Sequence, residues 1–211
     1  MEDLPKLLRK VNKLVNEGRY RAALNILQRI IRAYPNEKVA WLWQGEIFYN
    51  MRKYSKALNS SDKALKIDPN FAMAWYMRGA ALLELGEDWE ALNSFTRASE
   101  INPQYSEAWN SGGAVLFKMG RYEEALRFFD KALKTNPGSA STWSNRGATL
   151  YELGRYEEAL KSYEKALEID PNFHAAWHNR GNTLRELGRY EEALKSYEKA
   201  LEIEPSYAKA W

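Results

Sequence analysis

The sequence predicts an all-α protein in which one pair of helices is repeated along the chain. Three observations predict it: tryptophan recurs at a fixed interval, proline recurs at the same interval, and the segments between them have the apolar spacing of amphipathic helices. The interval is 34 residues, as the step from Trp41 to Trp75 shows (75 − 41 = 34). A single globular core has no reason to place its largest side chains at one interval, whereas stacked repeats do.

Six repeats of this length account for nearly all of the 211 residues. We place them at residues 4–37, 38–71, 72–105, 106–139, 140–173 and 174–207, with residues 208–211 opening a seventh. The repeats form one array over residues 1–211. The recurring tryptophans are Trp41, Trp75, Trp109, Trp143, Trp177 and Trp211. A proline follows the second helix of every repeat, because a helix interior needs the N–H that proline lacks. These prolines are Pro35, Pro69, Pro103, Pro137, Pro171 and Pro205.

The repeat at residues 140–173 shows how each element follows from its residues. Trp143 marks the first helix, and the small residue Gly147 is expected to let two helix backbones approach each other. Gly154 separates the two helices, since glycine adopts a left-handed turn at little cost. The segment 156–167 then has apolar residues at i, i+3, i+4 and i+7, which is the period of an amphipathic helix.

Three repeats depart from this pattern. The first has Leu7 and Val11 where the others have tryptophan and glycine, as expected of a terminal cap. The second has Arg52 at the position of the glycine between the helices. In the third, the aromatic residue that opens the second helix is Trp89, one position later than the usual tyrosine.

The pattern of tryptophan and glycine, then Gly-x-Tyr, alanine, an aromatic residue, alanine and proline resembles the tetratricopeptide repeat. The resemblance covers nearly the whole chain. It implies a right-handed superhelical α-solenoid of antiparallel helix pairs. It also implies that the first helices line a concave groove that holds an extended peptide or a partner helix, by shape and anchoring side chains.

Charge and composition indicate which cellular location and which classes of partner to expect. The net charge is +3, but residues 1–35 hold eight Lys and Arg against three acidic residues, so the positive excess lies in the first repeat. A protein that follows a phosphate backbone would carry a basic stripe along several repeats, so nucleic acid is not expected as the main partner. No apolar run is long enough to span a bilayer, there is no signal peptide, and cysteine is absent. A cytoplasmic protein without a membrane partner is expected.

Sequence motifs of catalysis are missing. The chain has no phosphate-binding glycine loop, no nucleophile elbow and no His-Glu-x-x-His motif. The two histidines, His174 and His178, share one helix face, but no third metal ligand accompanies them. We therefore expect no enzyme activity, no cofactor and no metal site.

The helical period selects the side chains that face the groove. In the N-terminal half they are apolar, aromatic or methionine, which suits an apolar anchor of the ligand. In the C-terminal half they are rich in asparagine, whose amide both donates and accepts hydrogen bonds with a peptide backbone. Asn145 and Asn179 resemble the asparagine ladder that holds peptide main chain in the repeat array of O-linked N-acetylglucosamine transferase. The candidate site residues are Leu42, Trp43, Glu46, Tyr49, Met73, Tyr76, Met77, Asn110, Phe117, Asn145, Tyr151, Asn179, Asn182 and Arg185.

Other interpretations stay open at this point. Trp43 and Met77 can instead pack within the stack, and the asparagines can be ordinary surface residues. The leading function is a scaffold that binds a peptide segment or partner protein of unknown identity. The alternatives are a structural module that self-associates through its C-terminal end, and a substrate-recruiting array of a larger enzyme. Because the seventh repeat stops at Trp211, the chain is expected to be cut from a longer array.

Overall fold

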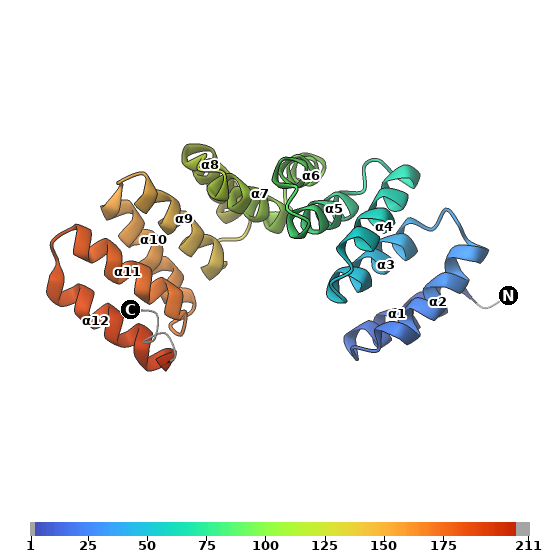
Figure 1. Cartoon of the computed structure of the whole chain (residues 1–211), viewed down its shortest axis with the longest axis horizontal. Helices are drawn as coiled ribbons and strands as arrows, with labels where there is room; N and C mark the ends of the chain where they lie inside the picture. The colour runs from blue at the N-terminus through green and yellow to red at the C-terminus, as the bar shows by residue number, and fades with distance from the viewer. Residues whose placement is uncertain (1–2, 206–211) are drawn as a thin grey trace. The chain divides into compact units, whose positions relative to one another are not determined.

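The computed structural model describes residues 3–205, which form twelve α-helices joined by short turns and no strand (Figure 1). The prediction of an all-α fold of helix pairs is confirmed. The first helices of the pairs begin at the residues where the sequence places the start of each repeat. The expected opening of a seventh repeat, residues 208–211, lies outside the described residues. The helices are α1 (Leu4–Asn16), α2 (Tyr20–Ala33), α3 (Lys38–Asn50), α4 (Tyr54–Ile67), α5 (Ala72–Glu84), α6 (Asp88–Ile101), α7 (Ser106–Lys118), α8 (Tyr122–Thr135), α9 (Ala140–Glu152), α10 (Tyr156–Ile169), α11 (His174–Glu186) and α12 (Tyr190–Ile203).

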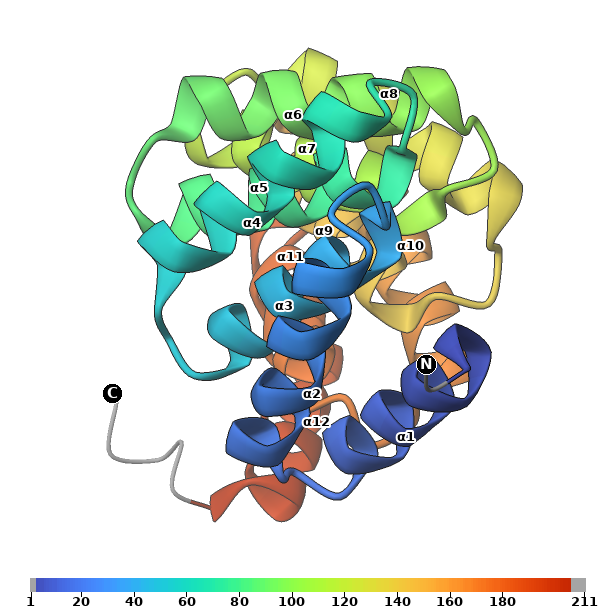
Figure 2. The ribbon, with the colours of Figure 1, turned by 90° about the vertical axis from the view of Figure 1, so that its right-hand side faces the viewer.

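The chain separates into two compact units, Met1–Pro103 and Gln104–Trp211, which we call the N-terminal unit and the C-terminal unit. In each unit every odd-numbered helix packs against the even-numbered helix that follows it (Figures 1 and 2). First helices of neighbouring repeats also touch: α3 contacts α5 in the N-terminal unit, and α9 contacts α7 and α11 in the C-terminal unit. We call the surface formed by α3 and α5 the first-helix face of the N-terminal unit, and that formed by α7, α9 and α11 the first-helix face of the C-terminal unit.

Four of the recurring tryptophans make the same contact with a recurring proline. The indole N–H of Trp143 donates a hydrogen bond to the carbonyl of Pro137 at 2.9 Å, and Trp177 bonds Pro171 at 2.8 Å. The same contact joins Trp41 to Pro35 at 3.0 Å and Trp75 to Pro69 at 2.8 Å. Each indole thus ties the start of one repeat to the turn that ends the previous one, and its only polar atom is satisfied.

In the first helices α5, α7, α9 and α11, a glycine makes room for an aromatic ring of the paired second helix. A Cβ built on Gly147 would lie 2.8 Å from the ring of Tyr163, and one on Gly113 would lie 2.8 Å from Phe129. The sequence predicts that Gly147 lets two helix backbones approach each other. In the structure, Gly147 instead makes a close contact with the ring of Tyr163. A Cβ built on Gly45 would instead lie 3.3 Å from the backbone carbonyl oxygen of Ala57, in the repeat where Ser61 stands at the position of the aromatic ring.

The turns between paired helices use left-handed backbone. Gly120, Gly154 and Gly188 have φ of 72°, 70° and 73°, as their sequence position predicts. Arg52 occupies the same position with φ 57°, the one positive value at a residue other than glycine among residues 3–205. In this left-handed conformation the Cβ of an L-residue lies close to the following carbonyl oxygen, which costs free energy.

Candidate functional site

The first-helix face of the N-terminal unit is built on partly buried aromatic and methionine side chains. Trp43 packs against two core clusters, one shared with α1 and α2 and one shared with α4 and α5. Met77 packs against the second of these clusters, whereas Met73 is 51% exposed. Trp43 and Met77 therefore stabilise the stack and still keep part of their surface accessible.

Leu42 does not belong to the accessible surface. Its side chain is only 3% exposed and packs with Ala64, Leu65 and Ala74 from the two helices next to it. The expectation that Leu42 faces a ligand is wrong, because the helical period gives direction but not how deeply neighbouring helices cover a short side chain. Tyr76, at the equivalent position of the next repeat, is half-buried and packs on Phe95 with ring centroids 5.5 Å apart.

Two polar side chains complete this face. The Tyr49 hydroxyl donates a hydrogen bond to Glu84 at 3.3 Å, which links α3 to α5. Burial, together with the charge of Glu84, raises the pKa of Tyr49. Glu46 is half-buried and makes no hydrogen bond or ion pair with any described residue, and burial raises the pKa of its carboxyl group.

The carboxamides of the C-terminal unit form only part of a ladder. The Asn145 amide donates to the side-chain oxygen of Asn110 at 3.2 Å and so connects α9 to α7. Asn182 accepts a hydrogen bond from the Tyr197 hydroxyl at 2.9 Å. The side chain of Asn179 makes no hydrogen bond within the described chain, so its donor and acceptor are both available.

Two neighbouring pockets open on the first-helix face of the C-terminal unit. The larger has a volume of about 360 Å³, and its lining residues are Phe117, Ala148, Tyr151, Glu152, Tyr163, Asn179 and Asn182. The smaller has a volume of about 70 Å³, and its lining residues are Ala114, Phe117, Phe129, Asn145 and Ala148. Phe117 and Ala148 are shared, so the pockets adjoin. Five of the candidate residues predicted from sequence therefore lie together: Phe117, Asn145, Tyr151, Asn179 and Asn182.

Two candidates of the C-terminal unit, Arg185 and Asn110, line neither pocket. Arg185 is exposed and pairs with Glu186 at 3.0 Å, and it lines neither pocket. Asn110 reaches the smaller pocket only through its bond to Asn145. Sequence reasoning missed Tyr163 and Phe129, because they belong to second helices. The signal was available, since a glycine stands sixteen residues before each of them (163 − 147 = 16).

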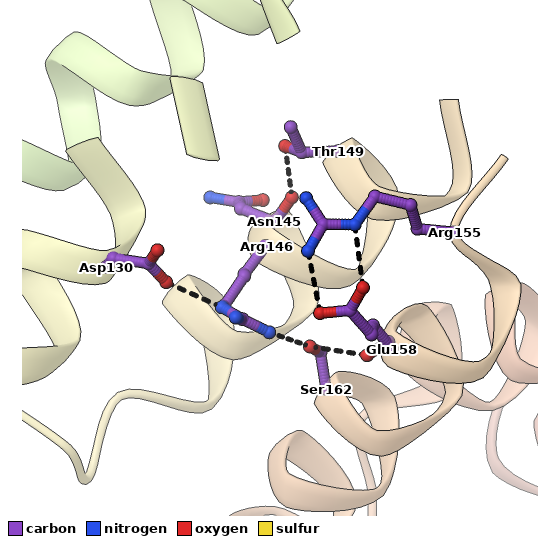
Figure 3. Close-up of polar contacts among 7 residues, drawn as sticks. All are labelled: Asp130, Asn145, Arg146, Thr149, Arg155, Glu158 and Ser162. Atoms are coloured by element: carbon purple, nitrogen blue, oxygen red, sulfur yellow. Dashed lines mark hydrogen bonds and ion pairs between the residues drawn. The ribbon is translucent and has the colours of Figure 1, made fainter. Parts of the chain in front are cut away.

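Arginine side chains that join consecutive repeats were also missed. Figure 3 shows Arg146 extending from α9 toward Asp130 and Ser162, with Nε 2.7 Å from the Asp130 carboxylate and Nη1 2.7 Å from the Ser162 hydroxyl. Arg78 makes the same pair of contacts with Asp62 and Ser94. Arg180 does so with Glu164 and Ser196. These contacts bind α5, α9 and α11 to the repeat that precedes each of them and so fix the position of these first helices.

The comparison with protein families identifies the chain. Models described as tetratricopeptide repeat match residues 8–58, 72–105, 106–139, 140–173 and 174–207, and one described as TPR repeat matches residues 45–86. The chain belongs to the tetratricopeptide repeat family. No curated protein matches it in sequence.

Solved structures share the architecture. One reported as the crystal structure of MamA is 25% identical, with a TM-score of 0.72 over 78% of this chain and 96% of that chain. YrrB, described as a TPR protein with an unusual peptide-binding site, is 24% identical, with a TM-score of 0.73 over 88% of this chain and 98% of that chain. PilF of Pseudomonas aeruginosa is 18% identical, with a TM-score of 0.85 over 95% of this chain and 91% of that chain. The likeness to YrrB and PilF is a likeness of fold.

No helix within residues 3–205 combines the length and apolar character that crossing a membrane requires. No three His, Asp or Glu side chains of the described residues are grouped so that they could hold a metal ion.

Proposed function

We propose that this protein is a non-catalytic interaction scaffold that holds a peptide segment of a partner protein against its first-helix faces. The observation that carries the proposal is the pair of adjoining pockets in the C-terminal unit. Pockets with apolar walls and a few polar groups are the usual form of a recognition site. YrrB, a protein of the same fold, has an unusual peptide-binding site.

The polar groups of the C-terminal face suit a peptide backbone. Asn179 offers an unoccupied amide, and the carboxamide of Asn145 stands one repeat away on α9. An extended peptide exposes one donor and one acceptor per residue, and an asparagine side chain can satisfy both. Phe117 and Tyr151 supply the apolar surface on which side chains of the peptide would rest.

The N-terminal face suits an apolar anchor accompanied by a cation. Trp43, Tyr76 and Met77 keep accessible apolar surface, and flexible methionine adapts to different ligand shapes. Glu46 supplies a carboxylate that no described cation neutralises. A lysine or arginine of the peptide beside an apolar residue would complement both features.

Site-specific photocrosslinking tests this proposal. A benzophenone amino acid replaces Arg185, which lies on α11 beside Tyr151 and outside both pockets, and in a matched control it replaces the exposed Lys161 on the outer helix α10. We expect a crosslinked partner at residue 185 and none at residue 161. Crosslinking at residue 161 alone would contradict binding on the first-helix face.

A second candidate function, self-association, is favoured by one specific comparison. Helices α10 and α12 have identical sequences, yet Leu160 of α10 is 6% exposed and the equivalent Leu194 of α12 is 59% exposed. On α10, Glu164 meets Arg180 of the next repeat at 3.5 Å. Glu198 on α12 is the equivalent of Glu164, and the exposed Lys10 on α1 is the equivalent of Arg180. If two copies stack head to tail, Glu198 of one copy can pair with Lys10 of the other.

Light scattering over a range of concentrations tests self-association. Stacking of copies predicts a molar mass that rises with concentration, and Glu198→Lys should suppress the rise because it brings two cations together. A mass that stays at 24.5 kDa throughout would rule this candidate out.

A further inference from the structure

Tyr163 of α10 holds its ring beneath α9. Its side chain is 1% exposed, and its ring atoms Cε1, Cζ and Cδ1 lie 2.8, 2.9 and 3.0 Å from the position that a Cβ on Gly147 would take. Phe95 and Phe129 occupy the equivalent positions of earlier repeats with no hydroxyl group. A phenylalanine therefore suffices for this packing, and the hydroxyl of Tyr163 needs another explanation.

Tyr163 is one of the residues that line the larger pocket. Its hydroxyl makes no hydrogen bond with any described residue, although no fully buried side-chain oxygen or nitrogen of residues 3–205 lacks a partner. The hydroxyl must therefore reach the space of the pocket. Tyr197, the equivalent residue of the next repeat, instead donates its hydroxyl proton to Asn182 at 2.9 Å.

The groups around this hydroxyl decide which ligand it can accept. Burial, with smaller effects from Tyr151 and Glu152, raises the pKa of Tyr163, so the hydroxyl keeps its proton and remains a donor. Glu152 lines the same pocket and forms no ion pair within the described chain. Asn182 uses its oxygen for Tyr197, which leaves its amino group as a second donor. The pocket thus combines donors at Tyr163 and Asn182 with an acceptor at Glu152.

We propose that this pocket receives the carboxamide side chain of a glutamine or asparagine in the bound peptide. The carbonyl oxygen of the ligand accepts from the Tyr163 hydroxyl, and its amino group donates to Glu152. This assignment rests on the proposed function, because it names the side chain that one of the two pockets selects.

Other side chains satisfy the pocket less completely. A carboxylate would accept from Tyr163 but would meet the like charge of Glu152. An ammonium group would pair with Glu152 but has no acceptor for the Tyr163 proton. An aliphatic side chain would displace water from the hydroxyl and leave it without a partner. It fits the adjoining smaller pocket instead, where Phe129 stands in place of Tyr163.

Four peptide libraries test the assignment on the full chain. Each contains acetylated, amidated heptapeptides that are random except for a central Gln, Glu, Lys or Leu. Immobilised protein captures peptides from each library, and mass spectrometry quantifies the captured amount. Tyr163→Phe removes only the hydroxyl, and Phe95 and Phe129 show that the ring position accepts phenylalanine. Tyr156→Phe is the matched control, because Tyr156 lies on the same helix and does not line the pocket.

We expect the wild-type protein and Tyr156→Phe to capture the Gln library about fivefold above the Leu library, the factor of about one net hydrogen bond. Tyr163→Phe should lose this preference while it captures the Leu library as before. Equal capture of all four libraries, or a Gln preference that survives in Tyr163→Phe, would overturn the assignment and leave the scaffold function standing. Capture of no library above a blank surface would overturn both.

Discussion

The ring of Tyr163 fills the space that a side chain at residue 147 would need: a Cβ on Gly147 would stand 2.8 Å from the ring's Cε1 atom. The contact joins the two helices of one repeat, and Tyr163 also helps to line the larger pocket. Glycine at residue 147 therefore contributes both to the packing of α9 against α10 and to the shape of the larger pocket.

Gly147→Ala should lower the free energy of unfolding by about 1–2 kcal/mol. The added methyl group forces the Tyr163 ring to move, and this overpacking outweighs the gain in helix propensity. Denaturation with urea measures the change. Gly138→Ala is the control, since a Cβ there meets only the Asn136 side chain at 3.6 Å. Equal stability of the two variants would show that the ring yields without cost.

Arg146→Ala should destabilise the C-terminal unit by about 1–2 kcal/mol. The Arg146 side chain is only 20% exposed and makes two charge-assisted hydrogen bonds that alanine cannot make. Arg155→Ala is the matched control. Its ion pair with Glu158 lies at the surface of one helix, and its loss should cost less than about 0.5 kcal/mol. Thermal unfolding of both variants measures the difference. A larger loss in Arg155→Ala would contradict the role given to Arg146.

Arg52→Gly should stabilise the N-terminal unit by about 1 kcal/mol. Arg52 has φ 57°, where the other inter-helix turns have glycine, and removing its Cβ relieves the strain of a left-handed residue. The reverse change in another turn, Gly154→Ala, should destabilise by a similar amount, since it introduces the same strain at φ 70° in open space. Urea titration measures whether the free energy of unfolding of each variant rises or falls. A lower value for Arg52→Gly than for the wild-type protein would contradict the backbone strain assigned to Arg52.

Glu46 should make the N-terminal unit less stable at neutral than at acidic pH. Burial raises the pKa of Glu46 above the ordinary 4.5, so its contribution is fully present below that value and is lost as pH rises through the raised pKa. Glu46→Gln should therefore gain less than about 1 kcal/mol at pH 7, since half of the side chain remains in water. Urea titration of the wild-type protein and of Glu46→Gln at pH 4 and pH 7 measures the gain in free energy of unfolding at each pH. A gain of equal size at both values would contradict the assignment.

The sequence predicted most of the fold because the fold depends on local signals. The intervals of Trp143 and Pro137 come from one hydrogen bond that Trp41, Trp75 and Trp177 also make, so the boundaries of these repeats could be read directly. The helical period also predicted which side chains of the first helices share a face. Phe117, Tyr151 and Asn179 meet at one pocket for this reason.

The remaining features depend on contacts between helices. Tyr163 reaches the pocket from beneath α9, which the period of α10 alone does not show. Arg146 contacts both the preceding repeat and its own, so its role requires two helix packings to be known. Leu42 has the direction expected of a groove residue but is covered by α4 and α5.

The central claim is that peptide binds on the first-helix face, and NMR mapping tests it most directly. Backbone amide signals of the full chain are recorded as the Gln library is added. The account predicts that shifted signals concentrate on α7, α9 and α11, around Phe117, Ala148 and Asn179. Shifts confined to the outer helices α8, α10 and α12, with these three signals unchanged, would contradict it.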